Sequence, residues 1–108
     1  MLNMKYREAK ERAKILKAMG HPMRILIVNA LTDQDLYGVD LCKLGTISQS
    51  NVSRHLAMLK RVGIISDHRI DKKVLYHLET PSVLDTLEPA AKAVRHDIQR
   101  RIERTKAV

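Results

Sequence analysis

Apolar residues recur at helical spacing over the first part of the chain. Over Lys5–Met19 they fall on one face, with Lys and Arg on the others; the apolar face carries Tyr6, Ala9, Ala13 and Leu16. This pattern predicts an amphipathic helix that Gly20 ends. Pro22 suits the first turn of a second helix over Pro22–Leu31. The run Ile25–Val28 also has strand propensity, and periodicity alone leaves a buried strand possible there.

A polar stretch, Thr32–Asp35, separates these helices from a short segment, Val39–Leu44. Gly45 then provides a turn. Ser48 or Ser50 can cap the helix that follows, because their side chains accept hydrogen bonds from its free amides.

This following helix has a narrow apolar stripe, and Gly63 stops it; the stripe is Val52, Leu56 and Leu59. Two short helices, a glycine-containing turn and a third helix that opens with small polar side chains form a helix-turn-helix pattern. We therefore expect a helix-turn-helix over Val39–Arg61.

The period changes to two between Ile64 and Leu78. Apolar or small residues alternate with polar ones on both sides of Asp71-Lys72-Lys73, which predicts a β-hairpin with a basic tip. Ser82–Lys106 returns to helical spacing. Pro89 lies inside this last segment, so we expect a kink or break near Asp85–Glu88. The apolar stripe of this segment is Leu84, Leu87, Ala91, Val94, Ile98 and Ile102.

The first and last predicted helices each have an apolar seam. Both seams can pack onto the core of their own chain, or they can pair with a second chain. Because 108 residues bury only a thin core, pairing into a homodimer is favoured.

The helix predicted after Gly45 has the side chains that a recognition helix needs on its exposed N-terminal half. Gln and Asn can pair with adenine and Arg with guanine, while Ser serves bases or phosphates. The alternative is an ordinary surface helix with a polar face. The residues concerned are Ser48, Gln49, Ser50, Asn51, Ser53, Arg54 and His55. Near the hairpin tip, Arg69, Lys72 and Lys73 are placed to lie along a phosphate backbone.

Composition supports a polyanionic partner. Lys and Arg number 20 against 12 Asp and Glu, a net charge of +8. The single cysteine, Cys42, excludes an internal disulfide and fits a reducing compartment. The longest apolar run, Ile25–Val28, is too short to span a bilayer, and the charged N-terminus is unlike a signal peptide. We therefore expect a cytoplasmic protein with no membrane partner.

Four stretches resemble the ArsR/SmtB family of repressors. They are His21–Ile25, Ile47–Leu59, Gly63–Ile65 and Val74–Leu78, and the resemblance runs from about Leu16 to Leu78. It implies a mainly α winged helix-turn-helix with a small β-hairpin, in the order four helices, two strands and a fifth helix. One domain would span residues 1–108, with Ile64–Leu78 as the wing and Pro22–Leu31 as a helix.

The resemblance also implies a mechanism. A homodimer, formed through Lys5–Met19 and Ser82–Lys106, would occupy a palindromic operator on double-stranded DNA and repress transcription. An effector (a metal, a metalloid or a thiol-reactive species) would release it. The alternatives are a regulator of this fold that answers to an organic ligand or to none, and a non-specific architectural nucleic-acid-binding protein.

Metalloid sensing in the family uses cysteines on the third helix. Asp40-Leu41-Cys42 matches the end of that cluster, but Tyr37 and Val39 replace the preceding cysteines. One thiolate gives little affinity for a soft ion. Cys42 is thus an effector candidate, with a small buried apolar residue as the alternative interpretation.

A second family site uses Asp, His and Glu on the last helix. Asp85 and His96, with Gln99, match it faintly, but the register is shifted and Gln is a poor zinc ligand. His55, His68 and His77 are interpreted as DNA-facing or surface residues. No nucleophile elbow, phosphate-cradling loop or paired-carboxylate setting is present in the sequence, so no enzyme is expected.

Overall fold

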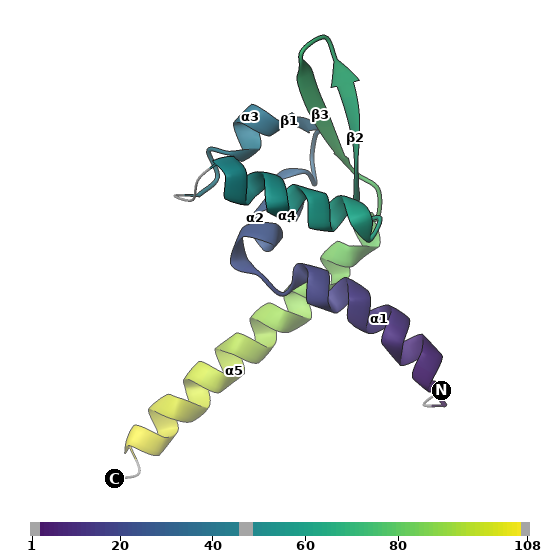
Figure 1. Ribbon diagram of the computed structural model, residues 1–108. Helices are drawn as coiled ribbons and strands as arrows, with labels where there is room; N and C mark the ends of the chain where they lie inside the picture. Colours follow the sequence, from purple (N-terminus) through teal and green to yellow (C-terminus); the bar gives the residue numbers. More distant parts are fainter. Residues whose placement is uncertain (1–2, 46–48, 107–108) are drawn as a thin grey trace.

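The computed structural model describes residues 3–45 and 49–106, without the side chains of 49 and 50. Helices and one small sheet follow one another along the chain (Figure 1). Their bounds are α1 Tyr6–Met19, α2 Pro22–Ala30, β1 Leu36–Tyr37, α3 Gly38–Leu41, α4 Gln49–Arg61, β2 Ile65–Ile70, β3 Lys73–Leu78, the 3-10 helix η1 Pro81–Thr86, and α5 Leu87–Lys106. The winged helix-turn-helix order expected from the sequence is confirmed.

Both helix boundaries near residue 20 have local causes. The amide of Gly20 donates to the carbonyl of Lys17 at 3.2 Å and closes α1. His21 caps α2, because its Nδ1 accepts from the amide of Met23 at 3.1 Å, and Pro22 occupies the first helical position. The strand alternative for Ile25–Val28 is thereby excluded.

The segment before α4 differs from the prediction. The helix expected over Val39–Leu44 is Gly38–Leu41, and Leu36–Tyr37 form a strand that the sequence did not predict. This strand, β1, pairs antiparallel with β3, which places Leu36 opposite Tyr76. Two residues are too few to show a period, so their pairing with a distant strand is invisible in the sequence.

Gly63 ends α4 as predicted, in the left-handed conformation with φ +83°. Its amide donates to the carbonyl of Lys60, and the amide of Ile64 donates to that of Leu59, both at 3.0 Å. These two bonds form a Schellman motif, in which Ile64 and Leu59 are both fully buried. The chain therefore leaves α4 in a fixed direction and enters the wing at once.

The sheet has strand order β1-β3-β2, so the expected hairpin has gained a third strand. In β2 and β3, Ile65 pairs with Leu78 at the buried base and Ile70 with Lys73 at the exposed tip. Asp71 in the two-residue turn has φ +56°. The wing is anchored at its base and projects from the body (Figure 1).

The C-terminal segment is divided as expected near Asp85–Glu88, but not by a kink within one helix over Ser82–Lys106. The 3-10 helix η1 ends at Thr86 and α5 begins at Leu87. Pro89 is the third residue of α5, where an amide has no intrahelical partner to lose. It therefore belongs to the start of a helix and does not interrupt one.

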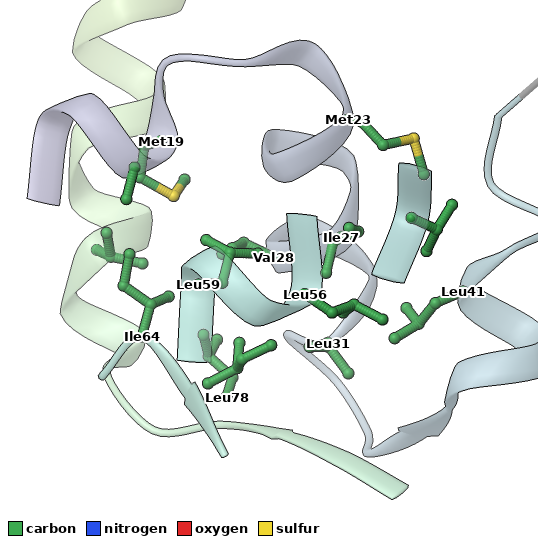
Figure 2. Packing of buried hydrophobic residues seen from close by; sticks show 14 residues of the cluster. Met19, Met23, Ile27, Val28, Leu31, Leu41, Leu56, Leu59, Ile64 and Leu78 are labelled. Atoms are coloured by element: carbon green, nitrogen blue, oxygen red, sulfur yellow. The ribbon is translucent and has the colours of Figure 1, made fainter. Parts of the chain in front are cut away.

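The core lies between α2, α4 and the base of the wing. Ile27 and Val28 of α2 face Leu56 and Leu59 of α4, with Leu78 of β3 beneath (Figure 2). Among the described residues no polar or charged side chain is buried.

Two helices extend beyond this core. The Cα radius of gyration is 17.1 Å, against about 13 Å for a compact chain of this length. The excess comes from α1 and α5, which project from the body (Figure 1). No residue of α5 is buried.

Candidate nucleic-acid interface

The helix α4 presents two different faces. Val52, Leu56 and Leu59 are at most 4% exposed and hold the helix to the core. Asn51, Ser53 and Arg54 are exposed to solvent on the same helix. Ser48 and the side chains of Gln49 and Ser50 lie outside the described part of the chain. Of the seven predicted recognition residues, three are thus gathered on one accessible surface.

His55 lies apart from these three. It is half-buried, and its Nδ1 accepts a hydrogen bond from Arg24 Nε at 3.1 Å. Its ring lies 4.2 Å from that of His21, centroid to centroid. Burial, followed by the neighbouring His21, Arg24 and Arg54, lowers the pKa of His55 below 6.5. The lowered pKa favours the neutral imidazole, and the hydrogen bond directs the side chain toward Arg24 of α2.

Arg24 joins three helices and was not identified from the sequence as a functional residue. Its Nε donates to His55 of α4, and its Nη1 donates to the carbonyl of Ala18 in α1 at 3.2 Å. Arg24 lies in the stretch His21–Ile25, which is part of the resemblance to the family. The resemblance assigned no role to Arg24 itself. Arg24 thus connects α2, in which it lies, to α4 and to the end of α1 by two hydrogen bonds.

The wing carries its basic residues at the tip. Arg69, Lys72 and Lys73 are all exposed, and Lys73 Nζ lies 5.3 Å from the centre of the Tyr37 ring. Nearer the base of the wing, Lys60 Nζ of α4 forms an ion pair of 2.8 Å with Asp67 of β2. Contact with Asp67, first of all its hydrogen bond, raises the pKa of Lys60. Helix and wing are thus linked as one surface.

The other histidines are placed at the surface. His68 is exposed on β2, and His77 of β3 lies 2.6 Å from Asp35, Nδ1 to Oδ1. The hydrogen bond to Asp35 raises the pKa of His77. This contact links β3 to the segment that precedes β1.

The candidate metal ligands are not brought together. Asp85 is on η1, and His96 is exposed on α5, where neighbouring Gln99 donates to Glu103 at 3.3 Å. Within residues 3–45 and 49–106, no group of three or more His, Cys, Asp or Glu side chains could hold a metal ion. In the same ranges, no helix combines the length and apolar character that crossing a membrane requires.

Comparison with known proteins identifies the family. Residues 21–67, which include α2, α4 and the start of the wing, match the model of the bacterial regulatory proteins of the arsR family. The transcriptional repressor SdpR of Bacillus subtilis is 33% identical over 73 residues, which cover 68% of this chain and 81% of SdpR. The chain belongs to the ArsR family. It is accordingly a DNA-binding transcriptional regulator and not an enzyme.

Solved structures of related regulators share the fold over most of the chain. The crystal structure of NolR from Sinorhizobium fredii has a TM-score of 0.72 at 29% identity, covering 86% of this chain and 96% of NolR. HlyU from Vibrio cholerae also has a TM-score of 0.72, at 28% identity, covering 82% of this chain and 97% of HlyU. HlyU carries the name of a transcriptional activator, whereas SdpR carries that of a repressor.

Proposed function

We propose that this ArsR-family protein is a homodimeric transcriptional repressor that binds a palindromic operator through α4 and the wing. The observation that carries the proposal is the exposed face of α4 beside the basic wing. Arg54, Ser53 and Asn51 are accessible on a helix whose other face is immobilised in the core. A helix held in this way can enter a major groove without losing its fold.

Base contacts and phosphate contacts fall to different parts of this surface. Arg54 would read guanine, and Asn51, with Gln49, would read adenine, because these side chains form paired hydrogen bonds with those bases. The serines on α4, together with Ser48, would contact bases or phosphates. Arg69, Lys72 and Lys73 of the wing would contact phosphates flanking the groove, which adds affinity without sequence preference. His55 would act indirectly, since its Nδ1 already accepts from Arg24.

The homodimer would form through α1 and α5. Val94, Ile98 and Ile102 of α5 are 44–58% exposed, and Tyr6 and Leu16 of α1 are 82% and 58% exposed. Apolar side chains arranged on two projecting helices would be covered by the same helices of a second copy. Residues 1–108 would then act as one domain, and two α4 helices would reach successive major grooves about 10 bp apart.

An effector would release the dimer from DNA. A protein that regulates transcription in response to a signal needs a ligand that binds the free and the DNA-bound forms unequally. In the bacterial cell this regulator would work in the cytoplasm, where the chromosome lies.

Transcription in vitro tests the repressor assignment. A promoter overlapping the protein's own selected DNA site is transcribed with increasing amounts of the wild-type protein or of Arg54→Ala. The proposal predicts that wild-type protein reduces the transcript and that Arg54→Ala needs a higher concentration for the same effect. An increase of the transcript, as the name of HlyU would suggest for that relative, would contradict repression.

A further inference from the structure

A cleft of about 300 Å³ opens between the wing and the helix-turn-helix. This volume is at the lower end of the range for small-molecule sites, about 300–1,000 Å³. Three parts of the fold form its walls. Tyr37 and Cys42 come from the β1–α3 segment, Ser53 from α4, and Lys72, Lys73 and Tyr76 from the wing.

Two tyrosines line the cleft, but Tyr37 pairs with Leu75, so its side chain shares the face of Leu75 and does not lie opposite the Tyr76 ring. Tyr76 is half-buried and lies so close to Gly38 that a Cβ at position 38 would be 3.3 Å from Tyr76 Cε2. Any side chain at position 38 would crowd this ring. Burial raises the pKa of Tyr76, so its hydroxyl stays protonated and can donate a hydrogen bond. Tyr37, half-buried on β1, faces the Lys73 ammonium at 5.3 Å. A planar apolar molecule fits walls of this kind.

The charge around the cleft has one sign. Lys72 and Lys73 line it, and none of the described lining residues is acidic. Neither lysine takes part in an ion pair among the residues that the structure describes. An anionic group would therefore gain two ammonium partners there without displacing a carboxylate.

We infer that this cleft is the effector site and that its ligand is a small organic anion with an aromatic ring, such as an aromatic carboxylate. The ring packs against the tyrosines that line the cleft, Tyr76 foremost, and the carboxylate meets Lys72 and Lys73. The inference rests on the proposed function, because the ligand engages the wing lysines assigned to phosphate and lies against Ser53 of the recognition helix. Ligand and operator therefore compete for one surface, which makes their binding mutually unfavourable.

Calorimetry on the protein without DNA tests the site directly. The probes are benzoate, 4-hydroxybenzoate and indole-3-acetate, with benzamide and inorganic phosphate as controls for charge and for the ring. We expect at least one aromatic carboxylate to bind about tenfold or more tighter than both controls. Phosphate binding as tight as the carboxylates would show that charge alone decides, and no carboxylate binding at millimolar concentration would show that the cleft is not a site. Either result overturns the inference.

Matched variants place the ligand within the cleft. Tyr37→Leu should weaken binding of the tightest carboxylate about tenfold, and Tyr37→Phe should retain it, because only the ring is needed. Lys73→Ala should weaken binding of the same ligand. Lys92 is an exposed lysine of α5, and Lys92→Ala should leave the binding unchanged. Equal effects of the two lysine variants, or no effect of Tyr37→Leu, would overturn the assignment.

Cys42 gives an independent readout, since it is the only cysteine in the sequence and lines the cleft. A bound carboxylate should slow the alkylation of Cys42 by iodoacetamide in wild type and in Tyr37→Phe. An unchanged alkylation rate at saturating ligand would place the ligand elsewhere and contradict the site.

DNA selection without ligand separates this inference from the repressor proposal. Protein that binds the carboxylates in the cleft but selects no DNA sequence would support the ligand site and contradict the repressor. Protein that selects an operator but binds no carboxylate would contradict the ligand site alone. Release of the selected operator by the carboxylate that shields Cys42 is the result expected when both hold.

Discussion

Arg24 Nε donates a hydrogen bond of 3.1 Å to His55 Nδ1, so α2 sets the orientation of a side chain on α4. The same guanidinium donates to the carbonyl of Ala18 at the end of α1. The position of α4 therefore depends on a polar contact as well as on the apolar stripe of Val52, Leu56 and Leu59.

Replacing Arg24 should reduce both stability and DNA affinity. Arg24→Ala leaves His55 Nδ1 without its donor and should lower the free energy of unfolding by about 1–3 kcal/mol. The exposed Arg7→Ala should stay within about 0.5 kcal/mol of wild type. Urea denaturation measures both variants. A loss no greater for Arg24→Ala than for Arg7→Ala would show that the contact does not stabilise the fold.

Two histidines should affect the pH dependence of stability in opposite directions. The folded pKa of His55 is lowered from 6.5, so its contribution is complete above about pH 6.5 and is lost as the pH falls toward the folded pKa. The folded pKa of His77 is raised from 6.5, so its contribution is complete below about pH 6.5 and is lost as the pH rises through the folded pKa.

Substitution of each histidine by Gln separates the two effects. Between about pH 8 and pH 5.5, His55→Gln should reduce the loss of stability on acidification, and His77→Gln should increase it. The measurement is the free energy of unfolding from urea titrations at several pH values. A change of the pH slope in the same direction for both variants would contradict these assignments.

The local patterns in the sequence predicted α1, α4 and the hairpin of the wing, whereas α2 needed the family resemblance and α3 was placed with other bounds. Pro22 and Gly63 act through their own backbone conformations, so a short window shows where α2 begins and α4 ends. The break before α5 was predicted as well, although Pro89 proved to be in the first turn. Features set by a single residue and its neighbours are readable from the sequence.

What the sequence did not reveal depends on contacts between distant segments. The strand Leu36–Tyr37 exists because β3 is beside it, and Lys73 meets Tyr37 only through that pairing. His55 fitted the recognition helix by position, but its contact with Arg24, 31 residues away, decides where its side chain lies. No periodicity encodes such tertiary contacts.

The apolar stripe of α5 should be required for the dimer. Ile98 is 50% exposed in the single chain, so Ile98→Glu should change the stability of that chain little. At an interface between two copies, the same substitution would bury a charge. We expect wild type to sediment as a dimer at micromolar concentration and Ile98→Glu to shift toward the 12.4 kDa monomer. Lys92→Glu, off the stripe on the same helix, is the control. A monomeric wild type would rule out the proposed dimer.

Arsenite should not release the protein from DNA. Tyr37 and Val39 occupy positions where the family's metalloid site has cysteines, and Cys42 offers one sulfur. Cys42→Ser should cost about 1 kcal/mol of stability and leave operator affinity near wild type. Titration of the DNA complex with As(III) checks this for both proteins. Release at micromolar As(III), abolished by Cys42→Ser, would show that the missing ligands come from elsewhere.

Arg54 and Lys72 should contribute to DNA binding in different ways. Arg54→Ala should cost about 1–3 kcal/mol at the preferred site and relax the choice at one base pair of each half-site. Lys72→Ala should keep the sequence preference and reduce the salt slope by about one phosphate. Fluorescence anisotropy over a range of salt concentrations measures both quantities. A changed base preference in Lys72→Ala, with none in Arg54→Ala, would reverse the two roles.

The central claim, that α4 reads a palindromic sequence as part of a dimer, is tested most directly by selecting binding sites from a random DNA pool. Wild type and Arg54→Ala are compared under the same conditions. The account predicts that wild type enriches two inverted half-sites about 10 bp apart, and that Arg54→Ala loses the preference at one position in each. Enrichment of no sequence by the wild-type protein, or the same sites with unchanged preference in Arg54→Ala, would contradict it.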